Sequence, residues 1–174
     1  MFGNFEEKAK KYQNLNETAI KHEVAVFGSD YLYSFPFYDY MQGKVTDYVV
    51  YNRSMEGLTV SEAIEVFPDC VKNLLPDTVL VSFGENEPAD DKFFSDYDKL
   101  IKKISSVCPS SRICVLATVG KDEEFDEKVK RIAKANRVNY ICSAKEAVSE
   151  EGLFKRMSSF FRGGKISFAD AFGI

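Results

Sequence analysis

The sequence predicts an α/β fold with a doubly wound, parallel, five-stranded sheet and helices on both faces, arranged in three layers. Five short runs of β-branched, aliphatic and aromatic residues alternate along the chain with longer stretches whose apolar residues recur at helical spacing. The apolar runs are continuous rather than interrupted by polar residues, which is typical of strands buried on both faces of a parallel sheet. Parallel strands need crossover connections, and the helical stretches supply them.

The predicted elements follow one another in a regular order. The chain has 174 residues and neither a repeat nor a linker, so residues 1–174 are expected to form one domain. The predicted strands are residues 24–27, 47–52, 78–83, 112–117 and 138–142. The predicted helices are an N-terminal helix within residues 1–20, then residues 59–75, 91–107 and 125–136. Thr59 or Ser61 is expected to cap the second of these helices, and Pro68 to kink or split it.

Charge and cysteine usage narrow the expected partners and location. The formal net charge is −4, and no basic run is dense enough to attract a phosphate backbone or an anionic membrane. We therefore expect neither a nucleic acid nor a membrane as partner. The first residues lack the apolar stretch of a secretory signal. The four cysteines are Cys70, Cys108, Cys114 and Cys142. They lie in or beside apolar segments without a CxxC pair, so we expect buried, reduced thiols in a cytoplasmic protein.

Several motifs for cofactors and catalysis are absent from the sequence. There is no GxxxxGK[ST] loop and no GxGxxG after a predicted strand, so no nucleotide cofactor is expected. The single histidine, His22, precedes the first predicted strand and is expected to be a surface or packing residue. Without another histidine, we expect neither a zinc site nor an ordinary serine hydrolase. Carboxylates gather after the strands, but such loops are commonly acidic, so no metal is assigned to them.

Three strand ends carry the residues of interest, because ligands of a doubly wound sheet bind beyond the carboxyl ends of its strands. These segments are Gly28-Ser29-Asp30, Asn52 through Gly57, and Gly84-Glu85-Asn86-Glu87. In this order they resemble three sequence blocks of the SGNH (GDSL-type) hydrolases: Gly-Asp-Ser, an Asn and a Gly before a helix, and Gly-x-Asn-Asp. The resemblance covers roughly residues 22–170 and implies an SGNH-hydrolase-like, three-layer fold of the flavodoxin-like kind.

The resemblance also implies chemical roles. Gly57, through its amide, and Asn86, through its side chain, would donate to the oxyanion that forms during acyl transfer. Asp30 falls where the family has its nucleophile, and Ser29 where the family has an acid. The family's last block, Asp-x-x-His, matches best around residues 161–166. There Arg162 would replace the orienting acid and Lys165 the base.

Three functions are consistent with these departures. In the first, the protein is a catalytically degenerate member of the fold: Asp30 pairs with Arg162 or Lys165, and the oxyanion-type pocket binds a small acyl or sugar ester ligand or a protein partner. In the second, it is an active ester hydrolase that uses Ser29 with Lys165 in place of the usual triad. In the third, it is a receiver- or flavodoxin-like binding domain in which Asp30 accepts a phosphoryl group or a metal.

Six aromatic residues crowd the segment that follows the first predicted strand, within residues 31–40. We expect them to pack beneath a loop, with a pocket or a partner surface as the alternative.

Overall fold

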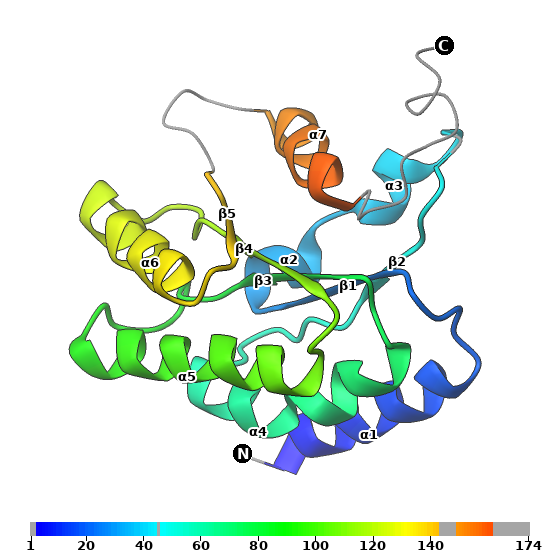
Figure 1. The fold of residues 1–174 in the computed structure, drawn as a ribbon, viewed down its shortest axis with the longest axis horizontal. Helices are drawn as coiled ribbons and strands as arrows, with labels where there is room; N and C mark the ends of the chain where they lie inside the picture. The colour runs from blue at the N-terminus through cyan, green and yellow to red at the C-terminus, as the bar shows by residue number, and fades with distance from the viewer. Residues whose placement is uncertain (1–2, 45, 143–148, 162–174) are drawn as a thin grey trace.

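The computed structural model describes residues 3–44, 46–142 and 149–161, and Figure 1 shows its fold. Within these ranges five strands form one sheet in the order β2-β1-β3-β4-β5, and every neighbouring pair is parallel. The strands are β1 (Val24–Gly28), β2 (Val50–Asn52), β3 (Thr78–Ser82), β4 (Arg112–Leu116) and β5 (Asn139–Ile141). This is a doubly wound order, whose switch point lies between β1 and β3. The predicted fold class is confirmed.

Helices cover both faces of this sheet (Figure 1). One face carries α1 (Gly3–Glu17), α4 (Val60–Val71), α5 (Asp91–Val107) and α6 (Glu123–Ala135). The other face carries α2 (Asp30–Ser34), α3 (Phe37–Met41) and α7 (Glu150–Phe161). Because side chains alternate along a strand, the central strands contribute to two apolar clusters, one on each face.

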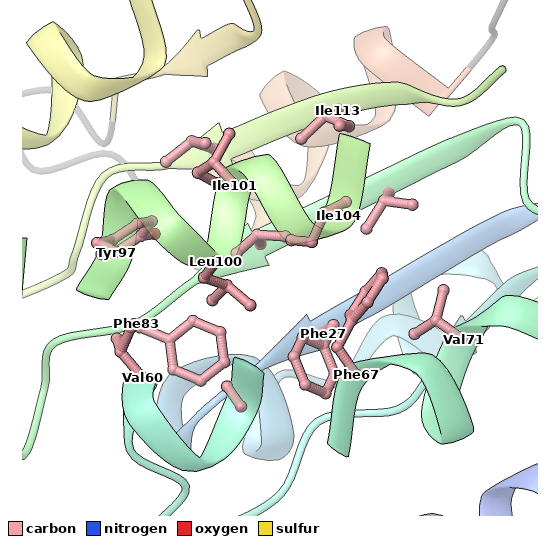
Figure 2. Close-up of a cluster of buried hydrophobic side chains, with 14 of the residues drawn as sticks. Phe27, Val60, Phe67, Val71, Phe83, Tyr97, Leu100, Ile101, Ile104 and Ile113 are labelled. Atoms are coloured by element: carbon pink, nitrogen blue, oxygen red, sulfur yellow. The ribbon is translucent and has the colours of Figure 1, made fainter. Parts of the chain in front are cut away.

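The larger cluster lies between the sheet and helices α4 and α5 (Figure 2). Ala25 and Phe27 of β1 point into it, whereas Val26 between them enters the cluster on the opposite face. The ring of Phe27 packs edge-on against Phe67 of α4 at 5.1 Å between centroids, and against Phe83 at 5.6 Å. All three rings are completely buried. Truncating such a ring to alanine costs about 3–5 kcal/mol, so this cluster holds α4 firmly against the strand that leads into the candidate site.

The start of α4 is capped as the sequence predicts. The side chain of Thr59 accepts a hydrogen bond from the Glu62 N–H, and the Glu62 carboxylate accepts one from the Thr59 N–H. This reciprocal pair satisfies two backbone donors that the first turn of a helix otherwise leaves open.

Of the two predicted effects of Pro68, the split is wrong, whereas the kink stays a prediction. Pro68 lies inside α4, which continues to Val71 and is followed by a 3-10 turn, η1 (Lys72–Leu74). Proline removes only one N–H···O bond from the helix. The apolar face on either side of it, including Phe67 and Cys70, is completely buried and keeps the helix on the sheet.

Helices α2, α3 and α7 lie where the sequence predicts no helix. The first two have only five residues each, too few to show a helical repeat of apolar residues. Helix α7 does have such a repeat, and its buried residues are Leu153, Phe154, Met157 and Phe161. In the aromatic segment 31–40, Phe35 and Phe37 are buried in the same cluster, as expected, whereas Tyr38 is 75 % exposed.

The cysteines and the histidine follow most of the sequence-based expectations. Cys70, Cys108 and Cys114 are buried free thiols, but Cys142 is exposed because it comes directly after the short edge strand β5. His22 is exposed at the amino end of β1, with Nδ1 3.5 Å from the Asp77 carboxylate. Among the described residues, no helix is long and apolar enough to cross a membrane.

Candidate functional site

The site begins at the tight turn from β1 into α2. Gly28 pairs with Ser82 of the neighbouring strand, and the Ser29 N–H donates to the Ser82 carbonyl at 3.3 Å. A Cβ at Gly28 would lie 2.5 Å from that carbonyl oxygen and 2.8 Å from Leu32, so only glycine fits the turn. The turn places Asp30 at the first position of α2, beyond the carboxyl end of the sheet.

The loop from β2 to α4 is held against the same strand end. The Met55 N–H donates to the Gly28 carbonyl at 3.1 Å, and the Arg53 N–H donates to the Val26 carbonyl at 2.7 Å. Gly57 then adopts φ +76°, a left-handed conformation that favours glycine. This conformation directs the Gly57 N–H toward α2, where it donates to Oδ1 of Asp30 at 2.6 Å.

The segment after β3 supplies the second donor. Gly84 has φ +117°, and a Cβ there would lie 2.7 Å from the ring of Phe125, so the chain can turn at this point only with glycine. Two residues later, Nδ2 of Asn86 donates to Oδ2 of Asp30 at 2.5 Å. Each carboxylate oxygen of Asp30 therefore accepts a short hydrogen bond from one of the two groups that the SGNH resemblance identifies as oxyanion donors.

These contacts stabilise the ionised form of Asp30. The hydrogen bond from Asn86 is the main cause of a lowered pKa for this carboxyl, and the Gly57 N–H and the Ser29 hydroxyl act in the same direction against partial burial. Ser29 itself is buried, and its Oγ donates to Oδ1 of Asp30 at 3.4 Å. Among the described residues, the only partner of the Ser29 hydroxyl is thus a weakly basic carboxylate, not a general base.

Three residues to which the sequence analysis gives no role hold the loops of the site. Nδ2 of Asn52 donates to the Leu32 carbonyl at 2.8 Å and thereby ties the end of β2 to α2. Glu85 accepts the Tyr31 N–H at 3.3 Å, and Glu87 accepts the Val60 N–H at 3.1 Å, so each carboxylate lies at a helix N-terminus. Burial raises the pKa of both glutamates. The sequence signal for such a role is an acidic residue directly after a strand, where its carboxylate can accept from the N–H groups of a neighbouring helix's first turn.

The structure brings together four of the six residues that the sequence analysis assigns to the site: Ser29, Asp30, Gly57 and Asn86. Arg162 and Lys165 lie outside the described residues, and so does their predicted ion pair with Asp30. Among the described residues, no group of three or more acidic, histidine or cysteine side chains could hold a metal ion.

Comparison with known proteins identifies structures that share this fold. No protein-family model matches the sequence, and no curated protein matches it. Solved structures do match over most of their length. A protein from Streptococcus pneumonia, described provisionally as a platelet activating factor, has a TM-score of 0.72 at 14 % identity over 90 % of this chain and 92 % of its own.

Two further structures extend the comparison. A GDSL-like lipase from Bacteroides thetaiotaomicron has a TM-score of 0.62 at 16 % identity, over 87 % of this chain and 83 % of its own. The periplasmic domain of a lipopolysaccharide acetyltransferase from Salmonella Paratyphi A has a TM-score of 0.59 at 16 % identity, over 90 % of this chain and 96 % of its own. The chain therefore has the SGNH fold of the GDSL-like lipases and acylhydrolases, as the resemblance implies. At these identities the likeness concerns the fold, and the activity must be argued from the site.

Proposed function

We propose that this chain is a catalytically degenerate SGNH-type domain that has kept the fold for binding. One observation carries the proposal: Asp30, which the resemblance aligns with the family's nucleophile, accepts hydrogen bonds from Gly57 and Asn86, which it aligns with the oxyanion donors. A serine hydrolase needs an activated hydroxyl and open donors at this place. Here the residue is Asp30, and the donors are already engaged.

The hydrogen bonds of Asp30 also oppose the binding of an ester carbonyl in the same place. Hydrogen bonds to an ionised group contribute about 1.5–3 kcal/mol each. Asp30 is partly exposed, so we take about 3 kcal/mol for the pair. A neutral carbonyl that displaced the carboxylate would be disfavoured on the order of 100-fold. His22 lies before β1 and Asp30 after it, a separation of roughly 17 Å along five strand residues, so this imidazole cannot serve as base.

We propose that the ligand is a small acyl or sugar ester or a protein surface. Of these, a sugar ester fits the site best, because it is rich in hydroxyl groups. Each oxygen of an ionised carboxylate can accept two hydrogen bonds. Gly57 and Ser29 donate to Oδ1 of Asp30 and Asn86 donates to Oδ2, so one acceptor position on Oδ2 is left for a hydroxyl group of a ligand. The partly buried carboxylate of Glu87 adds further acceptor positions nearby. The predicted cytoplasmic location belongs to this proposal and awaits a direct test.

The proposal is tested by hydrolysis of 4-nitrophenyl acetate by the purified full-length chain. Surface lysines react slowly with activated esters, so Lys10→Ala serves as a matched control for Lys165→Ala. We expect wild type, Ser29→Ala, Lys165→Ala and Lys10→Ala to release nitrophenolate at the same low rate. A rate that falls together in Ser29→Ala and Lys165→Ala, but not in Lys10→Ala, would establish the Ser–Lys hydrolase instead.

A further inference from the structure

A hollow of about 270 Å³ lies beside the candidate site, between α1, α2 and the loop that leads from β2 to α4. Tyr12 fixes one side of it, because its hydroxyl donates to the Ser54 carbonyl at 2.9 Å and so ties α1 to that loop. Met55 forms part of the lining and lies two residues before Gly57. The hollow therefore shares a loop with the site but does not include Asp30, Gly57 or Asn86.

The rim of the hollow is positively charged, although the chain as a whole is acidic. Lys8 and Lys11 lie about one turn apart on α1, and both line the hollow. Within the described ranges neither lysine forms an ion pair, and no carboxylate lines the hollow. Two ammonium groups without acidic partners create a local field that attracts an anion.

A third cation, Arg53, lies next to Tyr12, which lines the hollow. Arg53 is 9 % exposed, and its guanidinium lies 5.1 Å from the ring centre of Tyr12 and 5.3 Å from that of Tyr51. Its hydrogen-bond partners among the described residues are the neutral oxygens of Asn16 and Asn52, at 2.9 and 3.3 Å. A largely buried guanidinium without a carboxylate partner adds positive potential to the adjacent hollow, because burial reduces screening by water.

The rest of the lining is apolar or aromatic. Leu15 of α1 and Tyr33 of α2 are 48 % and 49 % exposed, and both line the hollow together with Met55. Single exposed apolar residues are ordinary. Two that come from different helices and meet at one hollow, next to lysines without an ion pair among the described residues, form a surface with an apolar wall and a charged rim.

We propose that this hollow binds an organic anion with an apolar body, namely a short alkyl carboxylate. The carboxylate pairs with Lys8 and Lys11, and the alkyl chain lies against Leu15, Tyr33 and Met55. Ligand pockets commonly have volumes of about 300–1,000 Å³. The volume of this hollow, about 270 Å³, lies just below that range and suits one short chain. The inference does not rest on the proposed function, because Asp30, Gly57 and Asn86 do not line the hollow.

The test is a titration of the ¹⁵N-labelled full-length chain with octanoate, followed by amide chemical shifts. We expect saturable shifts confined to α1, Tyr33 and the loop around Met55. In the double variant Lys8→Gln/Lys11→Gln, the dissociation constant should rise about tenfold, since two exposed ion pairs together contribute roughly 1.4 kcal/mol. Glutamine keeps the helix propensity of lysine, so the fold is preserved.

Two controls make the result specific. Lys10 is exposed on the same helix but does not line the hollow, so Lys10→Gln should leave the dissociation constant within twofold of wild type. Octanol, which has the same chain without the charge, should bind at least several-fold more weakly than octanoate. The inference is overturned if octanoate causes no saturable shifts at these residues, or if the double variant and Lys10→Gln bind it equally well.

Discussion

Replacing Asp30 by asparagine probes the contact on which the account of the site depends. Asp30→Asn keeps the shape of the side chain but removes its charge and turns one acceptor oxygen into a donor NH₂ group. The remaining oxygen can face the Gly57 N–H, so that the NH₂ group faces the Asn86 amide; the present donors lie 2.6 and 2.5 Å from the carboxylate oxygens. The Asn86 amide must then turn to offer its own oxygen to this NH₂ group. Both hydrogen bonds lose their charge assistance.

The magnitude follows from these two changes. A hydrogen bond to a charged group contributes about 1.5–3 kcal/mol, and a neutral one about 0.5–1.5 kcal/mol. Asp30, Gly57 and Asn86 are all accessible to water, which replaces part of what is lost. We therefore expect Asp30→Asn to lower the free energy of unfolding by about 1–2 kcal/mol at pH 7. Asp39→Asn is the matched control, because Asp39 is exposed on α3 and should stay within about 0.5 kcal/mol of wild type.

The effect should depend on pH with a defined sign. The folded-state pKa of Asp30 is lowered, chiefly by the hydrogen bond from Asn86. Its contribution to stability is therefore complete above the unfolded-state pKa of about 3.9, and is lost as the pH falls through the lower, folded-state pKa. Urea unfolding of wild type, Asp30→Asn and Asp39→Asn between neutral and acidic pH measures this contribution. The reasoning is refuted if Asp30→Asn and Asp39→Asn have the same stability at pH 7.

Two further predictions concern the frame of the site. Gly28→Ala should destabilise the fold by more than about 2 kcal/mol in urea unfolding, since its Cβ would lie 2.5 Å from the backbone oxygen of Ser82. As a control, Gly120→Ala should cost only about 1 kcal/mol, because Gly120 has φ +84° but open space around it. A thiol reagent should modify Cys142 rapidly in the folded protein and the other three cysteines only on unfolding, because those three are buried and burial raises their pKa to about 11 or 12. A stability of Gly28→Ala equal to that of Gly120→Ala, or fast modification of more than one thiol, would contradict these expectations.

The sequence suffices for the sheet because each central strand is a run of buried residues on both faces. Residues 78–82 and 112–116 are recognised from composition alone, and the helices between them from apolar spacing. The sequence does not suffice for α2 and α3, because each has only five residues, little more than one turn. The positions of these two helices are set by Phe35 and Phe37, which pack in the same cluster as α7. Tertiary contacts, not local propensity, decide those segments.

The sequence also identifies which residues meet at the site but not how they pair. Asp30, Gly57 and Asn86 follow three different strands, and a parallel sheet necessarily brings those strand ends together. Electrostatic reasoning from the sequence pairs Asp30 with Arg162 or Lys165, and because both lie outside the described residues this ion pair stays a prediction. In the structure the carboxylate is bonded by a backbone N–H and a neutral amide, and the N–H depends on the left-handed turn at Gly57. A backbone donor has no side-chain signature, so the hydrogen bond from the Gly57 N–H to Asp30 could not be predicted.

The most direct test of the central claim is the amide proton resonance of Gly57 in wild type and in Asp30→Asn. A short hydrogen bond to an ionised carboxylate shifts an amide proton downfield. The account predicts a downfield Gly57 resonance at pH 7 that moves upfield in Asp30→Asn and, in wild type, on acidification below the usual aspartate pKa of about 3.9. A Gly57 resonance that is the same in both proteins at pH 7 would show that the Asp30 carboxylate does not occupy the proposed oxyanion donors.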